Sequence, residues 1–303
     1  MSSIGSQPIQ RWKILVTMLA LLGTTQGTAA QARGRANATG VQLAQASPQS
    51  LRVEADRQFQ RGNVNRAIQI WSQLILQGQD VEASLYNRTQ AYLVIRQPPL
   101  ALADLNSLER IQRPHIKFHT YLLKGVTLNE LHDFPGALKN FNLALGQDPN
   151  PLVYANRAIA YQNSGRLDLA EADLNQAVLS EASPASLYNL AAIQRQLGHY
   201  KQCLLNLNRA IGLNGGFPPA YSLRGVCHYY LGAYAMAVGD FLRANALDPG
   251  QPESYHYLGL SLTALKRPKE ANQFLLKAAD LYLGQNNQLR YQQVMQLLTK
   301  SGG

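Results

Sequence analysis

Small and large apolar residues recur along this chain at a nearly constant interval. The first register is a small residue in every copy, at steps of 34, 36, 33, 33, 34 and 34 residues: Ala67, Ala101, Ala137, Ala170, Cys203, Ala237 and Ala271. Twelve positions earlier stand Ala55, Thr89, Gly125, Ala158, Ala191, Gly225 and Gly259. Four positions later stand Trp71, Leu105, Phe141, Leu174, Leu207, Phe241 and Leu275. A period of this length predicts stacked copies of one structural unit.

Each copy has the pattern of two amphipathic helices. Apolar positions are separated by three and four residues, which is the stripe of a helix that packs on one side. The small positions let two helix axes approach closely, and the large ones fill the space between them. The chain must reverse midway through a copy, where Gly62, Gly165, Gly198 and Gly232 stand. The sequence therefore predicts an all-α chain of antiparallel helix pairs.

These residues resemble the tetratricopeptide repeat family. The stretches Gly125 to Pro149 and Tyr221 to Pro249 carry the family pattern best, the second with Gly225, Gly232 and Tyr234 in consensus places. The resemblance implies a right-handed α-solenoid of about seven helix pairs. It also implies a concave side, lined by the first helix of each pair, that binds peptides.

The predicted organisation has four parts. Residues 1–32 are a signal peptide, 33–47 a flexible linker, 48–286 the solenoid, and 287–303 a capping helix and tail. Its repeats are expected near 48–81, 82–117, 118–150, 151–183, 184–217, 218–251 and 252–286. The cap is predicted because a stack of repeats leaves an apolar face open at each end. It places Leu289, Val294, Leu297 and Leu298 on one face.

The N-terminal segment has the layout of a secretory signal peptide. Ile14 to Leu22 form an apolar run broken only by Thr17, and small residues at 28–32 suit cleavage. An uncleaved anchor, the other interpretation, would need roughly 18–20 apolar residues. The signal predicts export to a periplasm or to the lumen of a photosynthetic membrane, or secretion. No membrane span is expected in the mature chain.

Charge and composition narrow the function only slightly. The chain has 303 residues, 28 Lys and Arg against 18 Asp and Glu, and a formal charge of +10. The basic residues are dispersed, so nucleic-acid binding is not expected. The net charge does favour weak association with acidic partners or anionic surfaces.

The resemblance also assigns candidate residues to the concave side. Carboxamides can pair with an extended backbone whatever its sequence, and tyrosines give a large contact area at low entropic cost. An open, hydrated groove is the alternative explanation for the asparagines, and a shift in register would bury some tyrosines. The candidates are Tyr86, Asn87, Gln90, Asn156, Gln162, Tyr188, Asn189, Arg195, Tyr229, Tyr230, His256 and Tyr257. Packing positions are expected for Tyr121, Tyr154, Tyr221 and Tyr255.

Three arginines share one place in their copies, directly before the small residue: Arg88, Arg157 and Arg224. Structural support is expected of them, with the long stems covering the packing seam and the charged ends in water. Anion contact is the alternative.

No catalytic group, cofactor site or metal site is predicted. His115 and His119 are four residues apart but lack a third ligand. Cys203 and Cys227 are expected to be small buried residues. Because export would bring the chain into an oxidising compartment, a disulfide between them is the alternative.

The leading hypothesis is a non-catalytic scaffold that binds a protein or peptide in assembling an envelope or lumenal complex. A docking or regulatory module for a separate enzyme is the second hypothesis, and a structural solenoid without a defined ligand is the third.

Overall fold

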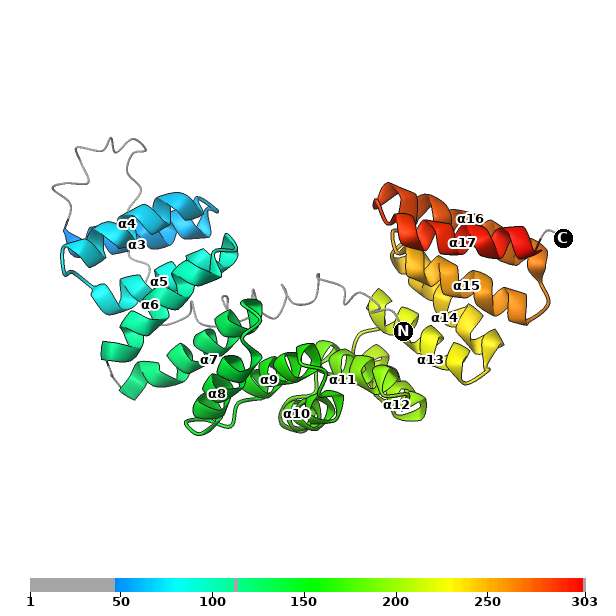
Figure 1. Ribbon diagram of the computed structural model, residues 1–303, viewed down its shortest axis with the longest axis horizontal. Helices are drawn as coiled ribbons and strands as arrows, with labels where there is room; N and C mark the ends of the chain where they lie inside the picture. Colours follow the sequence, from blue (N-terminus) through cyan, green and yellow to red (C-terminus); the bar gives the residue numbers. More distant parts are fainter. Residues whose placement is uncertain (1–46, 112–113, 302–303) are drawn as a thin grey trace. The chain divides into compact units, whose positions relative to one another are not determined.

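The computed structural model describes residues 47–111 and 114–301, and this part of the chain contains helices and no strands (Figure 1). The predicted signal peptide and nearly all of the predicted linker lie outside it. The helices are α3 (Pro48–Gln60), α4 (Val64–Leu76), α5 (Val81–Val94), α6 (Pro98–Ile111), α7 (Pro114–Glu130), α8 (Phe134–Leu145), α9 (Pro151–Asn163), α10 (Leu167–Ser180), α11 (Pro184–Gln196), α12 (Tyr200–Leu213), α13 (Pro218–Tyr230), α14 (Tyr234–Leu247), α15 (Pro252–Ala264), α16 (Pro268–Gly284) and α17 (Gln288–Ser301).

The chain divides near the start of α7 into two compact units, residues 1–116 and 117–303. The first unit contains the pairs α3–α4 and α5–α6, and the second contains the following pairs up to α17. In both units each helix packs on the next one along the chain. Within each unit the structure thus confirms the predicted all-α succession of helix pairs.

The turn inside each pair is fixed by one residue in the left-handed backbone conformation. The predicted glycines occupy it in four pairs, with φ between 75° and 81°. The equivalent places in the other three pairs hold Arg96, His132 and Lys266, with φ of 56°, 62° and 58°. An L side chain is strained in this conformation, so these three turns cost energy that a glycine would not.

The core is formed by the predicted registers. All seven residues of the small register from Ala67 to Ala271 are fully buried, and so are the rings of Trp71, Phe141 and Phe241. A Cβ atom on Gly125 would lie 2.6 Å from the Phe141 ring. The small residue is therefore required by a close approach of two helices, as expected.

The last helix, α17, packs on α16 as the predicted cap would. Val294 is fully buried, and Leu297 and Leu298 pack beside it against Tyr282. The prediction was wrong for Leu289, which stands in the first turn of α17 and is 64% exposed.

The four tyrosines predicted as core residues are only half-buried: Tyr121, Tyr154, Tyr221 and Tyr255. Two of them lie under arginines instead. The guanidinium carbon of Arg157 is 5.6 Å from the centre of the Tyr154 ring, and that of Arg224 is 5.4 Å from Tyr221. The rings of Tyr154 and Tyr221 therefore support the arginine side chains.

Candidate functional site

Within the second unit the first helices of the pairs form an inner layer. Here α11 contacts α13, and α13 contacts α15, in addition to the contacts between chain neighbours. The second helices α12 and α14 instead reach the next first helix along the chain. First helices that lie closer together than second helices line the inner side of a curved array. This inner layer of α11, α13 and α15 is the candidate site.

A group of tyrosines gathers on this layer. Tyr229 and Tyr230 end α13, and their rings lie 5.6 Å and 6.5 Å from the ring of Tyr257 in α15. Tyr200, at the start of α12, stacks on Tyr230 with ring centres 5.1 Å apart. Tyr230 remains 45% exposed, so the group presents an aromatic surface to the outside. Such a surface suits protein recognition, because a rigid ring loses little entropy on binding.

The hydroxyl groups of Tyr229 and Tyr257 stay protonated at neutral pH, because the pKa of each is raised. The Tyr230 and Tyr257 hydroxyl oxygens are 3.4 Å apart, and either can donate the hydrogen bond. Burial raises the pKa of Tyr257, and the hydrogen bond with Tyr230 raises it further. Burial also raises the pKa of Tyr229. The cluster therefore offers hydrogen-bond donors as well as ring surface.

The fifth pair contributes three of the predicted residues, all on α11. The ring of Tyr188 contacts Phe217 at 5.6 Å, and burial raises the pKa of Tyr188. The positive charge of Arg195, which is also on α11, lowers the pKa of Tyr188 by a smaller amount. Asn189 is half-buried on the same helix. These residues belong to one helix of the inner layer, as the register expected.

The asparagines predicted to line the concave side differ from one another in their contacts. Asn87 lies in the first unit and donates to the Asp56 carboxylate at 3.1 Å. Asn156 is 7% exposed and donates to the Leu152 carbonyl oxygen of its own helix at 2.8 Å. A side chain that bonds its own helix is not presented to a ligand. The shared place in the sequence therefore did not produce a shared orientation.

The other predicted residues are partly or wholly covered. In the first unit, Gln90 is 7% exposed, and burial raises the pKa of Tyr86 to about 12. In the second unit Gln162 is half-buried. His256 is 8% exposed, and its ring meets the ring of buried Tyr282 edge-on at 6.2 Å. Burial lowers the pKa of His256 to about 4, so this ring is neutral at pH 7.

Sequence reasoning missed an ion pair that recurs between the two helices of three pairs. Arg88, Arg157 and Arg224 donate to Asp104, Asp173 and Asp240 on the second helix of the same pair, with a shortest distance of 2.6 Å each time. Each arginine also donates to the preceding second helix, at Ser72, Asn142 or Asn208. These arginines have the structural role that was expected, since each one joins two neighbouring helices. Their charged ends, however, are bound to carboxylates that are 7% exposed or less.

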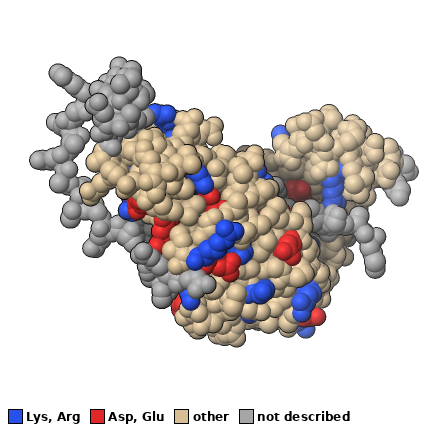
Figure 2. All heavy atoms as spheres, turned by 60° about the vertical axis from the view of Figure 1, so that its left-hand side comes forward, with Lys and Arg blue, Asp and Glu red and all other residues tan. Residues whose placement is uncertain are grey.

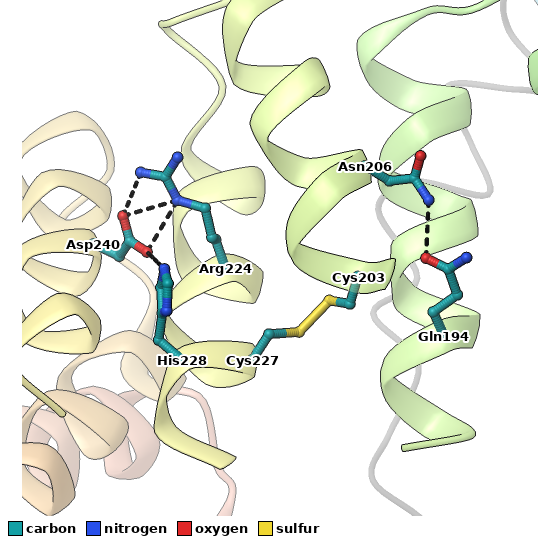
Figure 3. Close-up of a disulfide and its surroundings, with 7 residues drawn as sticks. All are labelled: Gln194, Cys203, Asn206, Arg224, Cys227, His228 and Asp240. Carbon is teal, nitrogen blue, oxygen red and sulfur yellow. Dashed lines mark hydrogen bonds and ion pairs between the residues drawn. A yellow bond between two sulfur atoms is a disulfide. The ribbon is translucent and has the colours of Figure 1, made fainter. Parts of the chain in front are cut away.

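Figure 3 shows the last of these ion pairs close to a disulfide. Cys203 in α12 is bonded to Cys227 in α13, and both are fully buried. The bond joins two consecutive pairs, next to Tyr229 and Tyr230 in sequence. His228 Nε2 lies 3.7 Å from Asp240 Oδ2, and burial lowers the pKa of His228. The buried positions of the cysteines were expected, and their bond settles what the sequence left open.

Charges elsewhere are mixed. On the face that Figure 2 presents, basic and acidic groups lie next to one another on a largely uncharged surface. Among the described residues, His, Cys, Asp and Glu form no group of three that could hold a metal ion. The side chain of His115 lies outside them. None of the helices described is both long and apolar enough to cross a membrane.

Comparison with known proteins identifies the repeat. A family model described as tetratricopeptide repeat matches residues 152–183. The "Lipoprotein NlpI homolog" of Haemophilus influenzae is 31% identical over 42% of this chain. "Tetratricopeptide repeat protein 6" of Homo sapiens is 27% identical over 47% of it. The matches span only 40% and 28% of those two proteins.

Solved structures agree in fold. The C-terminal part of a repeat protein from Cytophaga hutchinsonii aligns with a TM-score of 0.62, at 16% identity, over 75% of this chain and 94% of its own. YrrB, described as a TPR protein with an unusual peptide-binding site, aligns with a TM-score of 0.52 at 20% identity, over 62% and 96%. A structure of MamA aligns with a TM-score of 0.52 at 22% identity, over 57% and 96%. A tetratricopeptide repeat is thus matched at residues 152–183, and the solved structures show that the chain shares the fold of such repeat proteins.

Proposed function

We propose that this chain is a non-catalytic scaffold or adaptor that holds a protein or extended peptide against the inner layer of α11, α13 and α15. The observation that carries the proposal is the half-exposed tyrosine cluster of Tyr200, Tyr230 and Tyr257, which spans three consecutive pairs. A surface of this kind gives a partner a large area of contact at a small entropic cost. Tyr188, Asn189 and Arg195 extend it onto α11.

Two similar proteins support parts of this proposal, one for peptide binding and one for the cellular location. A protein of the same fold is described as having a peptide-binding site, and a relative in sequence is described as a lipoprotein homolog. Together with the signal peptide predicted at residues 1–32, they favour action outside the cytoplasm, in the periplasm or the lumen of a photosynthetic membrane. There the scaffold would take part in assembling an envelope or lumenal complex.

Two other functions give different results in a binding experiment. A docking module for a separate enzyme would retain one dominant catalytic partner. A structural solenoid without a ligand would retain no partner that depends on the inner layer. Both would leave the fold unchanged, so the identity of bound proteins separates the three.

The experiment is affinity capture of the tagged, full-length chain in its native host after chemical cross-linking. We would compare the wild type with a variant that carries Tyr230→Ala and Asn189→Ala. The matched control carries Leu205→Ala and Leu213→Ala, two side chains on α12 that are 65% and 59% exposed. The proposal expects a partner that is lost in the first variant and kept in the second, at equal thermal stability. Equal capture by all three chains would overturn it.

A further inference from the structure

The helices of the inner layer are almost free of acidic residues. No Asp or Glu occurs in α9, α11 or α13, and α15 has only Glu253, in its first turn. Helix α17 has none. The second unit contains twelve acidic residues in all, and they stand mainly on second helices and in loops. Helices α9, α11 and α13 therefore bring no carboxylate of their own to the surface that they present.

The basic residues of the same helices fall into two classes. Arg157 and Arg224 are held by Asp173 and Asp240, so their charge is neutralised. No ion pair in the described part of the chain involves Arg195 or Arg290. The nearest recorded polar contact of Arg290 is to the neutral side chain of Gln293, at 3.1 Å. Two cations therefore remain for a ligand.

Both of these cations act on the tyrosine cluster. The charges of Arg195, from α11, and Arg290, from α17, oppose the effect of burial on the pKa of Tyr257 in α15. Their places on the helices agree with this: Arg195 stands in the last turn of α11, which contacts α13, and Tyr230 ends α13. Arg290 stands in the first turn of α17. The Tyr257 hydroxyl group also contacts the hydroxyl of Tyr230. We name the following set the arginine–tyrosine strip: Arg195, Tyr230, Tyr257 and Arg290. It contains no carboxylate: its charged groups are two guanidinium groups, and its two hydroxyl groups can each donate or accept a hydrogen bond.

The size of the strip fits an extended chain. Packed helices have axes about 8–10 Å apart, so the three steps from α11 past α13 and α15 to α17 take roughly 24–30 Å. An extended chain advances about 3.3 Å per residue, so roughly seven to nine residues cover this distance. Alternate side chains of such a segment point toward the surface, where they can reach the two arginines in turn.

We propose that the arginine–tyrosine strip binds an extended acidic segment of a partner protein, whose side-chain carboxylates pair with the two arginines. The apolar atoms of the segment lie on the tyrosine rings, and the hydroxyl groups donate to its carbonyl or carboxylate oxygens. This inference rests on the proposed function and adds the chemistry of the partner. An anionic bilayer is the weaker alternative, because a flat surface does not enter the inner side of a curved layer.

The test measures binding of a defined probe to the full chain by fluorescence anisotropy. The probe is a labelled decapeptide in which Glu alternates with Thr, acetylated and amidated so that it has no terminal charge. A matched peptide has Gln in place of every Glu. We expect the Glu peptide to bind at least about tenfold more tightly, because hydrogen bonds to charged groups are the stronger ones. We expect Arg195→Gln and Arg290→Gln each to weaken the binding of the Glu peptide about threefold to tenfold.

The control variant removes the same charge from the outer side. Lys201→Gln and Arg209→Gln change two exposed cations on α12. If they weaken binding as much as the strip variants do, the attraction is general and the inference is wrong. Equal binding of the Glu and Gln peptides also overturns it, and leaves the proposed function in place because the layer would still bind peptide. Loss of binding to phosphatidylserine vesicles in the strip variants, with no binding of either peptide, would overturn it in favour of a membrane.

Discussion

The guanidinium group of Arg157 donates two parallel hydrogen bonds to the carboxylate of Asp173, at 2.7 Å from Nε and 2.6 Å from Nη2. The two residues are 16 positions apart, on the two helices of one pair. The same two places hold an Arg and an Asp together in three pairs and neither residue in the others. In the fifth pair they hold Leu190 and Asn206. Two helices of a pair therefore also pack together where these two places hold no Arg–Asp ion pair.

We expect Asp173→Ala to lower the free energy of unfolding by about 2–3 kcal/mol, because it leaves the charge of Arg157 buried without its partner. The double variant Arg157→Leu with Asp173→Asn copies the fifth pair. It should unfold within about 1 kcal/mol of the wild type, since no charge is left alone. Urea unfolding measures both. A double variant as unstable as Asp173→Ala would show that the contact depends on more than these two residues.

We expect the protein to become more stable when glycine replaces an L residue in the left-handed conformation of a turn. Lys266 is exposed and has φ of 58°. Lys266→Gly should raise the free energy of unfolding by about 1 kcal/mol, because glycine adopts this conformation without strain. The reverse change at the equivalent place, Gly232→Ala, should lower it by about 1 kcal/mol. If both variants were neutral in urea unfolding, the backbone there would not be strained.

Removing the disulfide should lower the free energy of unfolding. Cys203 and Cys227 close a loop of 24 residues, and a cross-link of this length stabilises a fold by about 3 kcal/mol through the entropy of the unfolded chain. A variant with Cys203→Ala and Cys227→Ala keeps small residues in both places and should lose about that amount. Unfolding the wild type in a reductant is the control and should give the same loss. A variant as stable as the oxidised wild type would contradict the prediction.

Acid should destabilise the second unit through His256. Its pKa falls from 6.5 to about 4 because of burial first and the charge of Arg290 second. The unfolded chain therefore binds a proton more readily than the folded one between these values, and stability is lost as the pH falls from 6.5 toward 4. We expect a loss of about 2–3 kcal/mol over that window. His256→Gln cannot titrate, so its urea unfolding should depend less on pH; the same slope as the wild type would assign the loss to other groups.

The sequence predicted the fold well because the packing of a helix pair is local and periodic. The close contact between Gly125 and Phe141 follows from two registers that lie in phase through all copies. The Arg–Asp pairs could also have been found in the sequence. Each of the three arginines has an aspartate 16 residues later, as Arg157 has Asp173. Sequence reasoning noticed the arginines and not their partners.

The candidate site was predicted less well because it depends on contacts between pairs. Tyr230 reaches Tyr257 only when two consecutive pairs have a defined rotation, and no local pattern sets that angle. The orientation of Asn156 is decided by a hydrogen bond to its own helix. A shared register predicts which helix a residue belongs to and leaves open which way its side chain turns.

The central claim is that a partner binds on the inner layer of α11, α13 and α15. The most direct test replaces Tyr230 with the photoreactive p-benzoylphenylalanine, which keeps an aromatic ring in place, and irradiates the full-length chain in its native host. A second chain with the same replacement at Leu213, on the outer helix α12, is the control. The account predicts a partner cross-linked from position 230 and not from position 213. A partner cross-linked from position 213 alone would place the binding surface on the outer helices and contradict it.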